Sequence, residues 1–305
     1  MSNDPPLDVS ALIDRLPQFS GYQLLGQGGG GAVYEVYDRV LGTQVALKLC
    51  WHGLGSQDPG RVRERFFREF DILLRAQPFP HLVRVHSRGA LPLPERRMEL
   101  LWYTMERCSG SLHQALRTLT LEDRVAVVLQ LLDGLSFLEA RKVAHRDLKP
   151  HNVFLRRVHK DIQIKIGDFG IARGVRGSEY DQSLTSRNVV MGTPLYLAPE
   201  VLEDPDLPDV MKADQYAAGL VIYETLSGGG FPFDRNVRNL FECIRSRRAP
   251  PVPLAVAGFR DEPYHTWQKI QRMIASDPRA RFRDLAQCKL ELRNALLYDG
   301  LPLPE

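Results

Sequence analysis

Residues 145–152 read HRDLKPHN, and no other stretch of the chain constrains its chemistry as tightly. Asp147 and Asn152 flank Pro150, which breaks regular helix, so a loop can direct both side chains into one cleft. Asp147 can orient an attacking hydroxyl and accept its proton, and Asn152 offers a neutral oxygen to a metal ion. Lys149 can neutralise charge on a group in transfer. The stretch therefore predicts a polar reaction site carried by a loop.

A second acidic motif lies further along the chain. Asp168, Phe169 and Gly170 follow the apolar strand pattern IQIKI. The Asp168 carboxylate is a hard oxygen ligand of the kind that Mg²⁺ prefers. Either motif alone could be a solvated loop or an ordinary turn. Their joint occurrence, in this order and at this spacing, makes that alternative negligible.

A glycine-rich stretch near the N-terminus predicts phosphate binding. Residues 26–33 read GQGGGGAV, which fits the pattern G-x-G-x-x-G-x-V. Glycines let backbone amides approach phosphates closely, although such a motif alone is weak evidence and could be a flexible turn. A dinucleotide-binding unit needs a helix after the glycines, whereas here two strand patterns follow, AVYEVYD and QVALKL. No P-loop pattern occurs in the sequence. We therefore expect a hairpin whose glycine tip covers a nucleotide.

One lysine interrupts an otherwise apolar strand pattern, VALK, which ends at Lys48. The simpler alternative is an edge strand with Lys48 in water. A lysine inside a sheet is rarely buried without a partner. Glu69 borders the apolar face of the helical pattern at residues 61–76, whereas Glu64 lies further toward its charged side. We predict an ion pair between Lys48 and Glu69, with Lys48 able to contact phosphate oxygens.

Composition narrows the function classes. The net charge is only +3, from 40 Lys and Arg against 37 Asp and Glu, which argues against nucleic acid as the main partner. No secretory signal is evident at the N-terminus, and no apolar stretch approaches the length of a membrane span. The four cysteines are widely separated, which favours reduced thiols over a zinc site. We expect a cytoplasmic protein that binds neither membranes nor nucleic acid.

The order of the patterns predicts an α+β chain of two lobes with a cleft between them. Residues 1–20 are expected to be an N-terminal extension with a turn of helix at 9–16. An N-lobe at about 21–107 and a C-lobe at about 108–305 should follow. The expected strands are 22–25, 33–37, 45–50, 81–85 and 100–105. The expected helices are 61–76, 120–139, 214–226, 267–275 and 286–297. Proline-rich loops are expected at 91–95, 204–208 and 249–253.

With these motifs in order, the chain from about Tyr22 to Leu297 resembles the eukaryotic-type protein kinase family, and bacterial eukaryotic-like Ser/Thr kinases in particular. The resemblance implies a bilobal fold, with a small antiparallel N-lobe sheet and one helix, and a larger, mainly helical C-lobe. It also implies an ATP site between the lobes, with two Mg²⁺ held by Asp168 and Asn152 and with Mn²⁺ as a substitute. No attached sensor, anchor or docking domain is expected.

Residue roles follow from the same resemblance. Met105 falls at the gatekeeper position, and Glu106 to Cys108 would be the hinge whose backbone pairs with adenine. The implied catalytic residues are Asp147, Lys149 and Lys48. The implied nucleotide-binding residues are Gly26, Gln27, Gly28, Gly29, Gly30, Gly31, Val33, Ala46, Lys48, Glu69, Met105, Glu106 and Cys108.

Residues 192–200, GTPLYLAPE, match the family's substrate-facing loop. Lys149 together with Thr193 is the combination typical of Ser/Thr specificity, so the implied partners are protein substrates, with self-association for autophosphorylation. Arg281 matches the arginine that pairs with Glu200. A pseudokinase is the first alternative, although such proteins lose an equivalent of Lys48, Asp147 or Asp168. A small-molecule phosphotransferase is the second, although it would lack the GTP…APE segment.

Three further expectations concern control and selectivity. Asp214 matches the acid that braces the catalytic loop, with a plain helix cap as the compatible alternative. A phosphate on Thr185, or next on Ser183, could bridge Arg146 and Arg173 and order the activation loop, and Ser178 and Ser186 lie in the same polar stretch. The alternative is a constitutively ordered loop. His151 stands where arginine-directed members carry an acid, so no strong preference for an upstream substrate arginine is expected.

Overall fold

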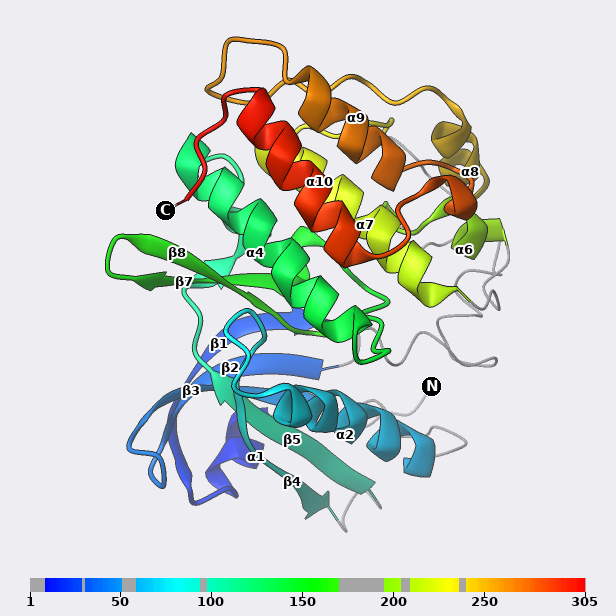
Figure 1. The fold of residues 1–305 in the computed structure, drawn as a ribbon. Coiled ribbons are helices and arrows are strands. Elements are labelled where there is room, and N and C mark those ends of the chain that lie inside the picture. The colour runs from blue at the N-terminus through cyan, green and yellow to red at the C-terminus, as the bar shows by residue number, and fades with distance from the viewer. Residues whose placement is uncertain are drawn as a thin grey trace. The chain divides into compact units, whose positions relative to one another are not determined.

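A computed structural model describes residues 9–28, 31–50, 59–93, 98–169, 195–203, 209–235 and 240–304 (Figure 1). The chain divides into two compact units. The N-terminal unit holds residues 1–78 and 83–108, and the C-terminal unit holds residues 79–82 and 109–305. The α+β architecture with a small antiparallel sheet and a mainly helical second part is confirmed.

The N-terminal unit is built on a five-stranded antiparallel sheet with the order β1-β2-β3-β5-β4. Its elements are α1 (Val9–Asp14), β1 (Phe19–Gly28), β2 (Gly31–Asp38), β3 (Thr43–Cys50), α2 (Pro59–Ala76), β4 (Val85–Leu93) and β5 (Met98–Glu106). Because side chains alternate along a strand, Val45, Leu47 and Leu49 face one side of β3. They join an apolar core to which α1 adds Leu12 and Ile13.

Helix α2 packs against β4 and β5. Phe66 and Phe70 of α2 contact the ring of Tyr103 on β5, at centroid distances of 5.2 and 5.9 Å. The strand expected at residues 81–85 was wrong. β4 begins only at Val85 and ends at Leu93, so it includes the first part of residues 91–95, which were expected to be a loop, and residues 94 and 95 lie outside the described residues.

The C-terminal unit is mainly helical, with a three-stranded antiparallel sheet in the order β6-β7-β8. Its strands are β6 (Gly110–Ser111), β7 (Val153–Val158) and β8 (Asp161–Ile166). Its helices are α3 (Leu112–Ala115), α4 (Leu121–Glu139), η2 (Pro150–Asn152), α6 (Pro199–Glu203), α7 (Val210–Leu226), α8 (Leu240–Arg248), α9 (Tyr264–Met273), η4 (Pro278–Ala280) and α10 (Leu285–Tyr298).

Helices α4 and α7 form the centre of this unit, and α10 packs against α4 and α9 (Figure 1). Thr120 caps α4 by accepting the Asp123 N–H at 3.1 Å. Helix α9 approaches α7 closely at Gly219, where an added Cβ would lie 2.7 Å from Ile274. Every residue of α7 from Asp214 to Leu226 is buried, so the segments that pack on this helix surround it.

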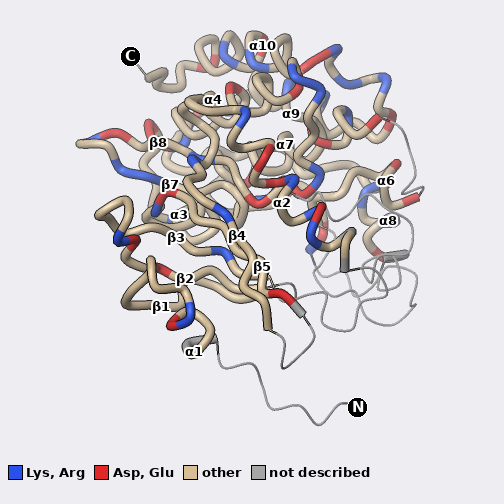
Figure 2. The backbone as a smooth tube through the Cα atoms, turned by 90° about the horizontal axis from the view of Figure 1, so that it is seen from below, with Lys and Arg blue, Asp and Glu red and all other residues tan. Residues whose placement is uncertain are grey.

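Charged residues of both signs are interspersed along the described chain (Figure 2). Within the described ranges, no helix combines the length and the apolar character needed to cross a bilayer.

Candidate active site

The catalytic loop is tied together by hydrogen bonds among the predicted residues. Pro150 opens the short helix η2, which places Asn152 beside Asp147. The Asn152 Nδ2 donates to the Asp147 backbone oxygen at 2.8 Å and to Asp147 Oδ2 at 3.1 Å. Lys149 Nζ donates to the same Oδ2 at 2.9 Å. The structure therefore brings Asp147, Lys149 and Asn152 into one polar cluster.

Asn152 also connects this loop to Asp168. Its Nδ2 donates to the Asp168 backbone oxygen at 3.2 Å, and its own backbone oxygen accepts the Gly167 N–H at 3.1 Å. These contacts direct the Asn152 amide nitrogen toward Asp147 and the Asp168 backbone, so the carbonyl oxygen Oδ1 lies on the opposite side of the amide group. Asn152 and Asp168 are thus hydrogen-bonded neighbours, and each carries a side-chain oxygen that could bind a metal ion.

These oxygens fit Mg²⁺. Magnesium ions at phosphate sites are held by one or two protein oxygens, with phosphate and water completing the octahedron. The donor set is oxygen only, which suits a hard divalent cation.

Asp214, at the start of α7, holds the catalytic loop by its backbone. Its Oδ2 accepts the His145 N–H at 2.5 Å and its Oδ1 accepts the Arg146 N–H at 2.9 Å. Arg146 has a φ of +66° and Asp168 a φ of +61°, both in the left-handed region that non-glycine residues rarely adopt. Burial raises the pKa of Asp214 to about 6, against the lowering effect of the two backbone N–H groups. The bracing role is confirmed, while the helix cap itself is Asp209.

His145 joins the two motifs through its buried ring. Its Nε2 lies 3.1 Å from the Gly167 oxygen, and its ring stacks on Phe169 with a centroid distance of 4.7 Å. Phe169 is itself buried. The residue after Phe169 lies outside the described part of the chain.

In the N-terminal unit, Lys48 and Glu69 form the predicted ion pair. Lys48 Nζ lies 2.8 Å from Glu69 Oε2, and Glu69 is 5% exposed. Strand β3 lies between β2 and β5, so the edge-strand alternative is wrong. Glu64, the other acid considered on α2, is exposed. The pair fixes the Lys48 ammonium on the face of the sheet that α2 covers.

The glycine-rich stretch forms the predicted hairpin, in which Gly28 of β1 pairs with Gly31 of β2. A Cβ at Gly31 would lie 1.9 Å from the Leu49 oxygen, so glycine is required there. Val33 pairs with Gly26 on one side and with Lys48 on the other. Gly29 and Gly30 lie outside the described residues.

The remaining nucleotide-binding candidates lie on β1, β3 and β5 or just after. Gln27 lies on β1, and Ala46 of β3 is buried and pairs with Met105 of β5. Glu106 ends β5, and its side chain accepts the Arg84 N–H at 2.8 Å. Cys108 is partly buried at the end of the N-terminal unit. Adenine pairing by the backbone of Glu106 to Cys108 stays a prediction.

The predicted pair between Glu200 and Arg281 is present and bidentate. Arg281 Nη1 and Nη2 donate to the two Glu200 carboxylate oxygens at 2.6 and 2.7 Å, and the Arg281 side chain is fully buried. Thr193 lies outside the described residues, as do Arg173, Ser178, Ser183, Thr185 and Ser186.

Sequence reasoning missed a second polar cluster, which holds Leu195 and Tyr196. Its members are Glu224 of α7, Arg235, and Arg247 of α8. The sequence did contain a signal for this cluster. Glu224 is a charged residue within an apolar pattern, as Lys48 is within an apolar strand pattern.

Comparisons with known proteins agree with this geometry. A family model described as protein kinase domain matches residues 19–290. The chain is 36% identical over 289 residues to the serine/threonine-protein kinase PknJ of Mycobacterium tuberculosis, which covers 92% of this chain and 46% of that protein. It is 35% identical over 233 residues to pkn2 of Myxococcus xanthus, covering 75% of this chain and 26% of pkn2. It is 31% identical over 242 residues to pakE of Dictyostelium discoideum, covering 78% of this chain and 24% of pakE. The chain thus spans less than half of the length of each of these relatives.

Proposed function

This chain belongs to the protein kinase family, and we propose that it transfers the γ-phosphoryl group of ATP to Ser and Thr hydroxyls of protein substrates. The observation that carries the proposal is the hydrogen-bonded cluster of Asp147, Lys149, Asn152 and the Asp168 backbone. Related proteins that carry the printed name serine/threonine-protein kinase support the same activity.

Each candidate catalytic residue of the chain has its own role in this reaction. Asp147 orients the attacking hydroxyl and accepts its proton, and Lys149, whose Nζ lies 2.9 Å from Asp147 Oδ2, supplies positive charge beside the reacting group. Asn152 Oδ1 and the Asp168 carboxylate would hold Mg²⁺, or Mn²⁺ in its place, and Lys48 would bind phosphate oxygens. When bound, ATP would supply the phosphoryl group, and its metal ions would supply the positive charge that screens the phosphates. The protein's contribution is positioning and electrostatic stabilisation rather than covalent chemistry.

We further propose control by phosphorylation of the activation loop, with Thr185 as the first site and Ser183 as the next. The supporting observation is that Arg146 has an exposed side chain while its backbone is fixed by Asp214. A phosphate could bind this exposed guanidinium through charge-assisted hydrogen bonds. Phosphatase treatment and the Thr185→Ala and Ser183→Ala variants should then lower activity, and unchanged activity in all three would refute this control.

Protein substrates, self-association for autophosphorylation and a cytoplasmic setting complete the proposal. The four free cysteines, two of them buried, support a reducing compartment.

Transfer of radiolabel from γ-labelled ATP to a generic protein substrate tests the activity. Lys48→Met and Glu69→Gln should both reduce transfer strongly, because the first removes the phosphate-binding cation and the second frees it from its anchor. Lys160→Met, at an exposed lysine after β7, is the matched control and should transfer normally. Normal transfer by Lys48→Met would refute the assignment.

A further inference from the structure

The backbone at Leu195 and Tyr196 is held by side chains that the proposed chemistry does not use. The Tyr196 hydroxyl donates to Glu224 Oε2 at 2.6 Å, and Arg235 Nη2 donates to Glu224 Oε1 at 2.6 Å. Glu224 is 2% exposed. Burial, and then the Glu224 carboxylate, raise the pKa of Tyr196, so the tyrosine remains a neutral donor. The side chain of Tyr196 is therefore anchored to α7.

Arg247, near the end of α8, anchors the neighbouring backbone. Its Nη2 donates to the Leu195 backbone oxygen. Its guanidinium lies over the rings of Phe233 and Phe231, at 4.7 and 5.3 Å from the ring centroids. Arg235 lies over the same Phe231 ring at 4.6 Å. Arg247 thus makes one hydrogen bond to the segment and two contacts with aromatic faces.

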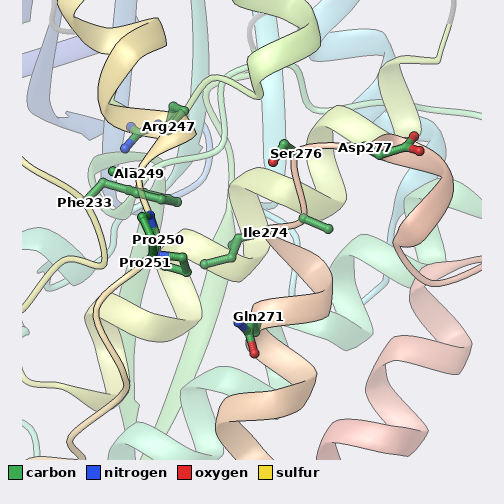
Figure 3. A pocket seen from close by; sticks show the side chains of 10 residues that line it. Phe233, Arg247, Ala249, Pro250, Pro251, Gln271, Ile274, Ser276 and Asp277 are labelled. Carbon is green, nitrogen blue, oxygen red and sulfur yellow. The ribbon is translucent and has the colours of Figure 1, made fainter.

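Close packing alone does not fix Arg247. Arg247 and Phe233 border a cavity of about 460 Å³, whose wall continues through Pro251, Gln271 and Ile274 (Figure 3). Arg247 and Pro251 lie on one side of this cavity and Gln271 and Ile274 on the other, with the Ile274 side chain pointing toward Pro251 (Figure 3). Because space adjoins the Arg247 side chain, its position depends on the Leu195 oxygen and on the aromatic rings.

Arg247 is also a costly residue to bury. It is 3% exposed, and its Nε and Nη1 have no hydrogen-bond acceptor among the described residues. Arginine cannot shed its charge to escape this penalty. An apolar side chain of similar length would avoid the loss of hydration at both nitrogens. Stability therefore does not explain an arginine here, whereas its bond to the Leu195 oxygen does.

We propose that Arg247 is a positioning residue that sets the Leu195–Tyr196 segment for binding of the protein substrate. The proposal rests on the proposed function, because residues 192–200 are the segment that would face the substrate. Its consequence is specific. Loss of Arg247 should weaken binding of the peptide substrate and leave ATP binding and folding intact.

The test compares Arg247→Met with Arg245→Met, an exposed arginine on the same helix. Arg247→Met should raise KM for a peptide substrate about tenfold, the size expected for a lost charge-assisted hydrogen bond. KM for ATP should change by less than about twofold, because the change acts on one substrate only. The thermal midpoint should hold or rise. Hydrogen exchange in the peptide that covers residues 195–201 should be faster. Arg247→Lys keeps a donor and should recover part of the peptide affinity.

The possible results distinguish a failure of the proposed function from a failure of the inference about Arg247. If the wild-type protein transfers no phosphate to any peptide, the proposed function fails and the substrate half of this inference fails with it. If the wild type is active but Arg247→Met has the wild-type KM for peptide, only the inference is overturned. A large fall in thermal midpoint with equal losses for ATP and peptide would also overturn it, since that result indicates a purely structural arginine.

Discussion

Asp214 holds Arg146 in a left-handed backbone conformation. The Asp214 Oδ1 accepts the Arg146 N–H at 2.9 Å, and Arg146 has a φ of +66°. That conformation costs a non-glycine residue about 1–2 kcal/mol. The carboxylate that offsets this cost stands on the buried helix α7, so the core of the C-terminal unit sets the geometry of the catalytic loop.

Asp214→Ala should therefore reduce kcat by about a hundredfold or more, because small displacements of catalytic groups are expensive. It should also lower the free energy of unfolding by about 1–3 kcal/mol for each buried N–H left without an acceptor. Asp209→Ala, which removes the exposed cap of the same helix, is the control. It should cost about 1 kcal/mol and leave kcat unchanged. A wild-type kcat for Asp214→Ala would contradict the bracing role.

Asp214 also predicts a pH dependence of stability. Burial raises its pKa from 3.8 to about 6, so the native state holds the proton more tightly than the unfolded state does. Its stabilising contribution to the free energy of unfolding is fully present below pH ~4. It is lost as the pH rises through ~6, and the loss is at most about 3 kcal/mol. Urea denaturation from pH 4.5 to 6.5 gives the free energy of unfolding of the wild-type protein and of Asp214→Asn. The difference between the two should fall over this range. A difference that does not change with pH would rule it out.

The Glu200–Arg281 pair predicts an asymmetry between its two partners. The Arg281 side chain is fully buried, so losing its partner leaves a guanidinium in the interior without its carboxylate, whereas Glu200 keeps 12% of its side-chain surface in water. Glu200→Ala should cost about 3–5 kcal/mol, and Arg281→Met should cost less because an apolar side chain fills the site. Chemical denaturation measures both, with Arg279→Ala as the control, because it removes the exposed partner of Asp277 and no measurable change is expected. Equal costs would show that the buried charge is not the source of the effect.

His151 bears on substrate choice. Its ring stacks on His113 with centroids 3.8 Å apart. Burial, then His113 and Lys149, lower its pKa, which favours the neutral imidazole, and a histidine in either form offers no negative charge to a substrate. A positional-scanning peptide array should show no dominant arginine two or three residues before the phosphorylated Ser or Thr. A dominant arginine signal at those positions would refute the argument, and His151→Glu should create one.

The sequence predicted the parts that depend on local pattern. Lys48 in an apolar strand and Glu69 beside an apolar helical face each carried a local anomaly, and the structure pairs them. The strand at residues 81–85 was wrong because strand β4 is defined by its pairing with β5, whereas its own sequence contains Gly89 and Pro92. Of that stretch, Leu82 forms only an isolated bridge, with Ile166. Local propensity cannot report pairing with a distant strand.

The cluster around Tyr196 was missed for a related reason. Arg247 and Leu195 are 52 positions apart, and Tyr196 and Glu224 are 28 apart. Neither pair follows a helical or strand period. Contacts of this kind depend on how α7 and α8 pack in the folded unit. The apolar pattern around Glu224 signals a buried acid, but it does not identify the partners of that acid.

Mass spectrometry of the purified protein and a generic substrate after incubation with ATP and Mg²⁺ tests the central claim most directly. The wild-type protein should add phosphate to Ser or Thr residues. Asp168→Asn should add none while keeping the wild-type thermal midpoint, because it removes a metal ligand without removing packing. Phosphorylation by Asp168→Asn at the wild-type level, or none by the wild type under these conditions, would contradict the account.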